Sequence, residues 1–432
     1  MSDRIVIKNE EKSTEKPINR AILVGLNANS LSYEENATEE SLEELAALLE
    51  TAGGESLGVI LQNKDTPEAR TYIGEGKVQE VKELVASMGA DMVVFDNSLS
   101  PSQQRVLSED IGVQVIDRAG LILDIFAQRA QTREGRLQVE LAQYKYLLPR
   151  LTGMWSHLVR QTAGGGKSPI GTRGPGETQL ETDRRHIRQK IDKLQEELES
   201  VRRVRGVQRE RRSKNEVPVV AIVGYTNAGK STLLNALTGS NIAANNRLFD
   251  TLDTTTRTLE ISDTCTVLLS DTVGFIRKLP HHLVEAFKAT LEELTFADLL
   301  LHVIDASSPE WRQQADVVEA LIRELGASET PRIEVFNKSD CNICDIMPHG
   351  EDIVSISAKT GQGLPELIAA IGTRLDSGAH KVTLHLPYAQ GGLVDTLYRE
   401  AKVESVDFGD VITVVVTCTP KILGQVADFI VP

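Results

Sequence analysis

The chain has 432 residues, of which 41% are hydrophobic and 25% charged, and its formal net charge is −15. This length exceeds what one hydrophobic core usually sustains, so we expect several domains. Residues 1–20 lack an apolar stretch of signal-peptide length, and no later run approaches the roughly eighteen apolar residues of a membrane helix. We therefore expect a cytoplasmic protein without membrane insertion.

The cysteines and the charge distribution narrow the class of protein further. Four cysteines are too few and too scattered for a disulfide framework, and the single CxxC pair of Cys341 and Cys344 lacks a second ligand pair for zinc, so we interpret it as incidental. Residues 129–214 hold 20 Lys and Arg against 10 Asp and Glu, a balance of +10 within an acidic protein. This segment is thus a basic island whose charge suits contacts to nucleic-acid phosphates.

We expect residues 1–20 to form a flexible segment. Residues 21–130 then alternate short apolar runs with helical patterns. AILVGL, GVILQ, DMVVFD and VQVIDR are the expected strands; helices are expected around Leu42, after Gly76 and from a cap near Ser100. This alternation predicts a small α/β domain with a mostly parallel sheet. The stretch TYIGEGK lacks the spacing of a phosphate loop, so Gly74 and Gly76 are interpreted as turn residues.

Residues 131–214 predict a basic helical hairpin. Apolar residues recur at helical spacing from Leu137 to Leu148 and again from Ile187 to Val201. Between them, the connector from about Thr152 to Glu177 is glycine-rich and carries Lys167 and Arg173. A disordered linker and a probe that orders on RNA or another partner are both compatible with this composition.

Strand and helix patterns alternate again over 215–376, where GYTNAGKS at Gly224–Ser231 fits GxxxxGKS between a strand and a helix. This motif wraps phosphates with backbone N–H groups, its lysine reaches the β- and γ-phosphates, and its serine hydroxyl can bind Mg²⁺. The remaining residues, 377–432, predict a small α+β domain. The expected fold is thus a multidomain α/β chain with a P-loop domain built on a mostly parallel sheet.

Three further motifs follow in the order that a GTPase needs. DTVG (Asp271–Gly274) supplies a magnesium-binding carboxylate and a backbone amide for the γ-phosphate. NKSD, at the end of a later strand, supplies Asn337, Lys338 and Asp340 for recognition of the base. Asp340 can accept both guanine N–H groups, an edge that adenine lacks. Ser357, Ala358 and Lys359 form a loop for the guanine carbonyl. We therefore predict a GTP hydrolase whose cofactors are GTP and magnesium.

A polar, threonine-rich segment at about 243–257 is the expected switch, because a threonine there can reach magnesium only when the triphosphate is bound. Sequence chemistry leaves Thr251, Thr254, Thr255 and Thr256 as alternatives. Phe275, directly after DTVG, cannot orient water by hydrogen bonding, so we expect slow unaided hydrolysis of about 10⁻⁴ to 10⁻² s⁻¹. Burial of Phe275 for structural reasons is the competing explanation.

Taken together, these parts resemble the HflX family of ribosome-associated GTPases over nearly the whole chain. The resemblance is carried by GTRGPGETQLETDRR, GYTNAGKSTLLNAL, LFDTLDTTTR, DTVGFIRKLP and TYIGEGKVQE. It implies that Thr251 is the magnesium-binding switch residue, with Thr255 and Thr256 as further candidates, and that a hydrophobic residue after DTVG is usual. Lys230, Gly274 and Thr251 are then expected in catalysis, and Ser231, Thr251 and Asp271 at the metal.

The full set of expected nucleotide contacts comprises the phosphate loop, the switch, DTVG, NKSD and the SAK loop. It consists of Gly224, Tyr225, Thr226, Asn227, Ala228, Gly229, Lys230, Ser231, Thr232, Phe249, Asp250, Thr251, Leu252, Asp253, Asp271, Thr272, Val273, Gly274, Asn337, Lys338, Asp340, Ser357, Ala358 and Lys359.

The family resemblance also implies binding to the large ribosomal subunit and to intact ribosomes, and splitting of stalled or idle ribosomes under stress with ribosome-stimulated GTP hydrolysis. Lys167, Arg173, Arg184 and Arg185 are the expected rRNA contacts. The competing explanation for the basic segment is a solvated helical hairpin whose charges form i,i+4 pairs and bind no RNA.

An assembly or hibernation-type GTP sensor without splitting is the main alternative function, and a metabolic α/β enzyme is disfavoured by NKSD and SAK. A monomer is expected, since no long uninterrupted coiled coil requires a dimer.

Overall fold

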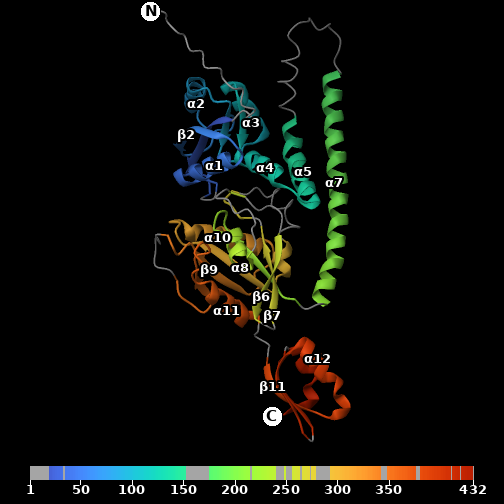
Figure 1. Cartoon of the computed structure of the whole chain (residues 1–432). Helices are drawn as coiled ribbons and strands as arrows, with labels where there is room; N and C mark the ends of the chain where they lie inside the picture. Colours follow the sequence, from blue (N-terminus) through green and yellow to red (C-terminus); the bar gives the residue numbers. More distant parts are fainter. Residues whose placement is uncertain are drawn as a thin grey trace, which may run out of the picture. The chain divides into compact units, whose positions relative to one another are not determined.

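The computed structural model describes residues 19–32, 35–151, 175–214, 217–239, 248–249, 255–262, 265–272, 274–278, 292–341, 348–375, 380–409, 411–418 and 420–431 (Figure 1). Contacts divide the chain into two compact units, Met1–Ile125 with Pro149–Gly174 and Phe126–Leu148 with Pro175–Pro432. The fold is the expected multidomain α/β arrangement. The division into five segments given above stays a prediction.

The first unit contains a four-stranded parallel sheet with the strand order β2-β1-β3-β4. Its elements are β1 (Arg20–Ala28), α1 (Glu39–Thr51), β2 (Glu55–Lys64), α2 (Glu75–Met88), β3 (Met92–Phe95), α3 (Pro101–Ile111) and β4 (Gln114–Asp117). Thr38 caps α1 and Ser100 caps α3, each through a reciprocal capping box. These caps explain why both helices begin where they do.

The start of α2 differs from the sequence expectation, and helix α4 was not predicted. Gly76 lies in the first turn of α2, preceded by Gly74 at the N-cap, so only Gly74 keeps the expected place outside the helix. Helix α4 (Arg118–Arg129) begins directly after β4. The Arg118 guanidinium is buried, donates to Asp96 Oδ1 at 2.7 Å and pairs with Glu44, so its charge is compensated inside the unit.

Helices α5 (Arg133–Leu147) and α7 (Pro175–Lys214) form the hairpin, and the 3₁₀ turn η1 (Leu148–Arg150) follows α5. Leu137 and Leu141 of α5 pack against Leu194 and Leu198 of α7. The ion pairs Arg133–Glu197 and Glu140–Lys190 link later residues of one helix to earlier residues of the other, so the two helices are antiparallel (Figure 1). Helix α7 already includes 175–177, which we had expected in the loop.

The P-loop domain contains a six-stranded sheet with the order β10-β9-β8-β5-β7-β6. Its elements are β5 (Val219–Gly224), α8 (Lys230–Thr238), β6 (Thr255–Ser262), β7 (Cys265–Asp271), η2 (Glu292–Phe296), β8 (Leu299–Asp305), α10 (Trp311–Glu324), β9 (Arg332–Asn337), β10 (Ile353–Ser355) and α11 (Leu364–Leu375). All neighbouring strands are parallel except β6, which pairs antiparallel with β7.

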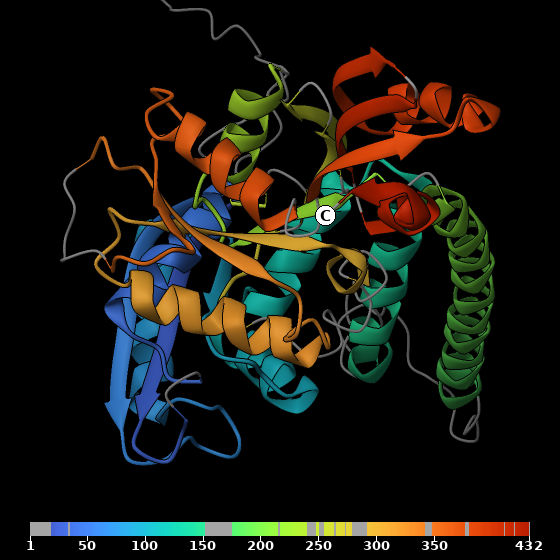
Figure 2. The same cartoon turned by 90° about the horizontal axis from the view of Figure 1, so that it is seen from below.

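Helices cover both faces of this sheet, as Figure 2 shows for α11 on one side and α10 on the other. Leu233 of α8 and Leu367 of α11 belong to the main core, whereas Trp311 of α10 packs on Phe336 of β9 with ring centroids 5.2 Å apart. Burial of both faces explains the continuous apolar runs of the central strands. It also leaves the carboxyl edge of the sheet as the place for ligand loops.

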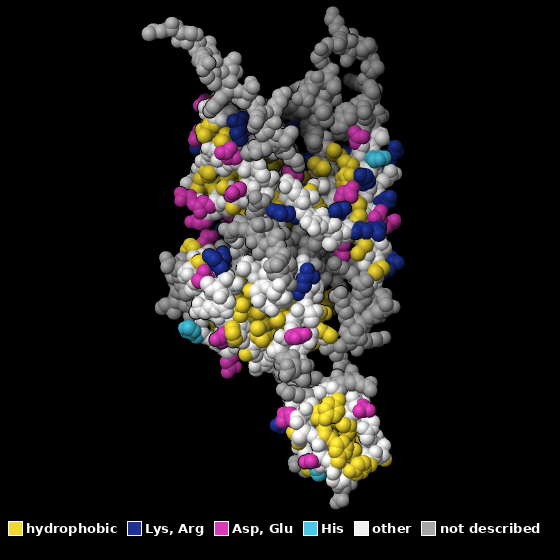
Figure 3. All heavy atoms as spheres, viewed as in Figure 1, with side chains coloured by type: hydrophobic (Ala, Val, Ile, Leu, Met, Phe, Trp, Pro, Cys, Tyr) yellow, Lys and Arg dark blue, Asp and Glu magenta, His cyan; other side chains and the backbone are white. Residues whose placement is uncertain are grey.

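The C-terminal part is an antiparallel sheet of order β12-β13-β11-β14 with short helices on one face. Its elements are β11 (His380–Leu386), η3 (Tyr388–Gln390), α12 (Gly392–Glu400), β12 (Lys402–Phe408), β13 (Ile412–Cys418), α13 (Pro420–Gln425), η4 (Ala427–Phe429) and β14 (Ile430–Val431). Figure 3 shows apolar side chains on its surface. The exposed large apolar residues of this part include Tyr388, Phe408 and Val411.

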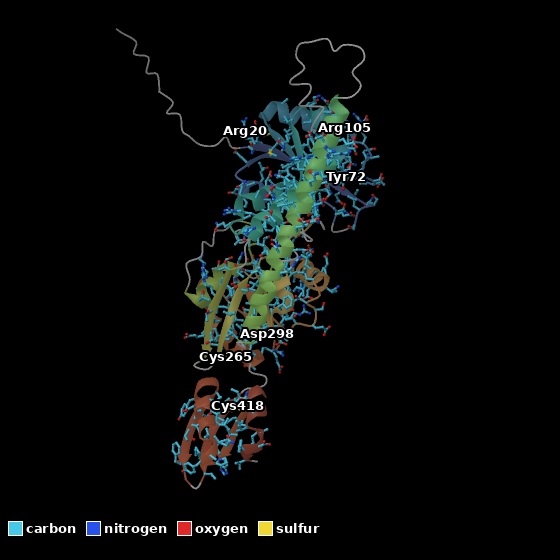
Figure 4. All side chains as sticks on the ribbon, turned by 90° about the vertical axis from the view of Figure 1, so that its right-hand side faces the viewer. Arg20, Tyr72, Arg105, Cys265, Asp298 and Cys418 are labelled. Atoms are coloured by element: carbon cyan, nitrogen blue, oxygen red, sulfur yellow. The ribbon has the colours of Figure 1, made fainter. Side chains whose placement is uncertain are left out.

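The cysteines are separated in the fold. Cys265 begins β7 and Cys418 ends β13, as labelled in Figure 4, and both are free thiols, as is Cys341. Cys344, the second cysteine of the CxxC pair, lies outside the described residues. None of the helices within the described ranges is long and apolar enough to cross a membrane.

Candidate nucleotide-binding site

Four parallel strands bring the predicted motifs to one edge of the sheet. Strand β5 ends at Gly224, β7 at Asp271, β8 at Asp305 and β9 at Asn337. At the amino-terminal ends of the strands, the Asp298 carboxylate (labelled in Figure 4) accepts the Val219 N–H at 2.8 Å and so joins the start of β5 to the start of β8. Because parallel strands share their direction, the loops at their carboxyl ends converge on one site.

Two glycines are required by the shape of the phosphate loop. Gly224 has φ +154°, and a Cβ there would lie 2.2 Å from the carbonyl oxygen of Val303 on the adjacent strand. Gly229 has φ +93° at the N-cap of α8, and a Cβ there would lie 2.2 Å from Asn337 Nδ2. Any larger residue at these positions would push the loop away from its neighbours.

Lys230 is buried inside the loop that it follows. Its Nζ donates to the carbonyl oxygens of Gly224 at 3.1 Å and Tyr225 at 2.7 Å. Burial lowers the pKa of Lys230 to about 8, an effect that the Asp271 carboxylate partly opposes. The ammonium is thus held over the loop by carbonyl groups that phosphate oxygens can replace.

Ser231 and Asp271 meet beneath the phosphate loop. The Ser231 hydroxyl donates to Asp271 Oδ2 at 2.7 Å, which joins the first turn of α8 to the end of β7. Hydroxyl and carboxylate oxygens are the hard ligands that Mg²⁺ prefers, and phosphates and water usually complete its shell. The two side chains therefore fit a magnesium ion held jointly with a nucleotide.

Backbone hydrogen bonds fasten the segment after DTVG to the phosphate loop. Thr226 N–H donates to the Phe275 carbonyl at 2.7 Å, and Phe275 N–H donates to the Gly224 carbonyl at 3.2 Å. Phe275 is 1% exposed, which supports the structural explanation for a phenylalanine at this position. Gly274 lies so close that a Cβ there would be 2.9 Å from Thr226 Cγ2 and 3.0 Å from Lys230 Nζ.

The NKSD and SAK loops are joined through Asn337, which is 2% exposed. Its Nδ2 donates to the Ala228 carbonyl at 2.8 Å, and its Oδ1 accepts the Ala358 N–H at 2.9 Å. The Ser357 hydroxyl donates to Asp340 Oδ1 at 2.7 Å and lowers the pKa of that carboxyl. Asp340 is exposed and ionised, as an acceptor for guanine N–H groups must be.

The predicted switch is described only in part. Asp250, Thr251, Leu252, Asp253, Thr254 and Val273 lie outside the described residues. Phe249 is buried with φ +55° and packs edge-to-face on Phe126 of α4, with ring centroids 4.7 Å apart. Thr255 and Thr256 lie in β6, opposite Asp271 and Ser270. The choice of switch threonine stays a prediction.

The remaining predicted contacts lie where the loops place them. Tyr225 and Ala228 are buried, Asn227 is exposed with φ +61°, Thr232 follows Ser231 in α8, and the Thr272 hydroxyl donates to the Ile222 carbonyl at 2.7 Å. Lys359 is exposed. Among the expected RNA contacts, Arg184 and Arg185 lie on α7, whereas Lys167 and Arg173 lie outside the described residues.

Several contacts at this edge were not predicted from the sequence. The Tyr225 hydroxyl accepts the Arg277 N–H at 2.9 Å, and the Arg277 guanidinium pairs with Glu310 at 2.7 Å. Asp305 pairs with Lys338 at 2.6 Å. The signal for Asp305 in the sequence is an acidic residue at the end of the strand DLLLHVID, because neighbouring parallel strands end at the same edge of the sheet.

Comparisons with known proteins place these parts in a family context. Residues 39–127 match the family model GTP-binding GTPase N-terminal, 129–212 match GTP-binding GTPase Middle Region and 219–338 match 50S ribosome-binding GTPase. A GTPase HflX of Caldanaerobacter subterraneus subsp. tengcongensis is 49% identical over 414 residues, covering 95% of this chain and 94% of that protein. The GTPase HflX of Escherichia coli K12 is 46% identical over 372 residues, covering 84% and 86%.

A solved structure is also similar to the chain. The crystal structure of a GTP-binding protein from the hyperthermophilic archaeon Sulfolobus solfataricus in complex with GDP has 25% sequence identity and a TM-score of 0.43. The match covers 83% of this chain and 99% of that one.

Proposed function

This chain belongs to the HflX family of GTPases and is a GTP hydrolase; from that premise we propose that it binds the large ribosomal subunit and splits stalled or idle ribosomes under stress. The observation that carries the ribosomal partner is the match of residues 219–338 to a model described as a 50S ribosome-binding GTPase. Ribosome-stimulated GTP hydrolysis, a cytoplasmic location with part of the protein ribosome-bound, and a monomeric state belong to the same proposal.

In this proposal each motif has one role, which the geometry of the site supports. Lys230 exchanges its loop carbonyls for β- and γ-phosphate oxygens, and the Gly274 N–H contacts the γ-phosphate. Asp340 reads the guanine edge, and the Ala358 N–H meets the guanine carbonyl. Mg²⁺, held by Ser231 and Asp271 with Thr251 as the proposed switch ligand, would neutralise phosphate charge when bound.

Hydrolysis requires an attacking water, and the chain offers no hydrogen-bonding side chain at the position directly after DTVG. Phe275 there is buried against the phosphate loop. We therefore place the stimulation in ordering of the switch segments by the ribosome, which would position the water and the Gly274 amide. Slow turnover by the isolated protein is the direct consequence.

The hairpin supplies the proposed RNA-binding surface. Arg185, Arg188 and Lys193 are exposed on α7, and Arg184 lies on the same helix. Exposed arginines and lysines on a helix can contact backbone phosphates, which makes binding depend on salt. With Lys167 and Arg173 of the preceding segment, Arg184 and Arg185 are our proposed rRNA contacts.

The first test is GTP turnover by the purified protein with and without isolated large ribosomal subunits. We expect strong stimulation by the subunits, and Lys230→Ala should abolish turnover in both conditions. Tight GTP binding without any stimulation would overturn the ribosomal assignment and leave the nucleotide site intact.

A second test separates splitting from the alternative role. Purified intact ribosomes are sedimented with the protein and a non-hydrolysable GTP analogue. Loss of the intact peak in favour of subunits supports splitting. An undiminished intact peak that carries bound protein would instead favour an assembly or hibernation-type sensor.

A further inference from the structure

One acidic side chain at the nucleotide edge lies outside every predicted motif. Asp305, the last residue of β8, pairs through Oδ2 with Lys338 Nζ at 2.6 Å. The two side chains are 16% and 27% exposed, so water screens the ion pair only in part. Lys338 belongs to NKSD, whereas Asp305 comes from the neighbouring strand.

Asp305 is itself held firmly in place. Its Oδ1 accepts the Ser307 N–H at 3.0 Å and the Ser307 hydroxyl at 2.6 Å. Its backbone lies in register with Asn337, and the Ala306 N–H donates to the Asn337 carbonyl at 3.0 Å. The carboxylate is therefore a fixed anchor at the end of β8 and not a mobile surface charge.

Lys338 needs such an anchor because of its backbone conformation. Its φ is +66°, in the left-handed region that costs free energy for any residue with a side chain. Strained backbone persists only where surrounding contacts over-determine it. Two contacts flank this conformation: the Ser339 N–H donates to the Ile356 carbonyl at 3.0 Å, and the ion pair to Asp305 fixes the Lys338 side chain.

The conformation of Lys338 decides where Asp340 points. The Lys338 carbonyl accepts the Cys341 N–H at 2.9 Å, which closes a tight turn around Ser339 and Asp340. On the other side of this turn, the Ser357 hydroxyl donates to Asp340 Oδ1. The guanine-reading carboxylate is thus positioned from two sides, by Ser357 directly and by Asp305 through Lys338.

We propose that Asp305 is a positioning residue for guanine specificity, acting through Lys338 to aim the Asp340 carboxylate. The inference deepens the GTP-binding site and does not depend on the ribosomal partner. Its consequence is selective: loss of Asp305 should weaken recognition of the guanine 2-amino group more than binding of the phosphates.

The test compares GTP with inosine triphosphate, which keeps the N1–H of guanine and lacks the 2-amino group. For Asp305→Asn in the purified full-length protein, we expect Kd for GTP to rise about tenfold, the scale of one charge-assisted hydrogen bond. Kd for inosine triphosphate should rise less, so the preference for GTP falls severalfold. The kcat at saturating GTP should stay within about twofold of the wild type, because the phosphate groups are unchanged.

Three further variants make the test specific. In a Lys338→Gly background, glycine adopts the left-handed conformation freely, so adding Asp305→Asn should no longer change the preference for GTP. Asp352→Asn removes a carboxylate paired with Arg374 elsewhere in the domain and should leave the preference unchanged. Ser307→Ala, which loosens Asp305, should shift the preference in the same direction by a smaller factor and serves if Asp305→Asn does not fold.

Equal loss of both nucleotides in Asp305→Asn would overturn the proposal, because it would indicate general damage to the site. A full effect of Asp305→Asn in the Lys338→Gly background would also overturn it, because Asp305 would then act by another route. Since no ribosomes are present, neither result bears on the ribosomal assignment.

Discussion

The Ser231 hydroxyl donates to Asp271 Oδ2 at 2.7 Å, so a residue of the phosphate loop and a residue of DTVG that would hold a magnesium ion are in direct contact. The contact joins the first turn of α8 to the end of β7. It places two hard oxygen donors of the kind that Mg²⁺ prefers side by side. Both residues were expected at the metal from their motifs, and their proximity supports that assignment.

We expect Ser231→Ala to weaken apparent Mg²⁺ affinity in GTP turnover by about ten- to hundredfold, the cost of losing a metal-site partner. A Mg²⁺ titration of turnover at saturating GTP measures the change. Ser231→Thr keeps the hydroxyl and should retain most of the affinity. An unaltered Mg²⁺ midpoint in the alanine variant would remove Ser231 from the metal site.

Gly274→Ala should slow GTP hydrolysis more than it weakens GDP binding. The new Cβ would approach Thr226 Cγ2 and Lys230 Nζ, so the Gly274 amide must move away from the γ-phosphate position. Loss of one such donor lowers kcat by about 10²-fold. Adding Thr226→Ser removes the nearer methyl group and should restore part of the rate. Single-turnover hydrolysis and GDP affinity distinguish the two effects, and equal losses in both would contradict this explanation.

Asn337→Ala should destabilise the protein as well as weaken GTP binding. The change leaves the Ala228 carbonyl and the Ala358 N–H without their present partner, and each unsatisfied buried group costs about 1–3 kcal/mol. Asn337→Asp keeps the acceptor for the Ala358 N–H but sets a buried carboxylate oxygen against the Ala228 carbonyl oxygen, so it should lose at least as much stability. Urea unfolding gives both values, and an alanine variant as stable as the wild type would refute the bridging role.

His302 of β8 predicts a loss of stability in acid. Burial, helped by the positive charges of Arg332 and Lys230, lowers the pKa of His302 to about 4. In the unfolded chain the pKa is about 6.5, so the unfolded state binds more protons below that pH. The stabilising contribution is complete above pH 6.5 and is lost as the pH falls towards 4.

At pH 5 this loss amounts to about 2 kcal/mol relative to pH 7. Urea unfolding of the wild type and His302→Leu at both pH values checks it, because the leucine variant should lose less stability on acidification. Identical losses in the two proteins would mean that His302 does not titrate as described.

Arg184→Ala with Arg185→Ala should weaken binding to isolated large subunits and flatten its salt dependence. Each lost phosphate contact lowers the slope of log K against log salt by about 0.7 to 0.9. Arg203→Ala, an exposed arginine farther along α7 that pairs with Glu199, is the matched control. An equal decrease in the control would mean that the contact is not specific to Arg184 and Arg185.

The sequence predicted the strands, helices and motifs whose signals are local. GxxxxGKS requires a strand before and a helix after, and β5 and α8 lie there. The predicted cap near Ser100 is confirmed at the start of α3. It did not predict β6, because its threonine-rich sequence has a polar composition suited equally to a switch loop. Strand β6 is formed by pairing with β7, which is a non-local interaction.

By itself, the sequence determined the fold class, the family and the identity of the nucleotide-binding motifs, since each depends on residue type at fixed spacing. Tertiary structure alone decided which groups meet: Asn337 between two loops, Arg277 on Glu310, and Asp305 on Lys338. These contacts join residues at the ends of different strands, so their spacing along the chain does not predict them. Their physical basis is the parallel sheet, which brings the ends of β5, β7, β8 and β9 to one edge.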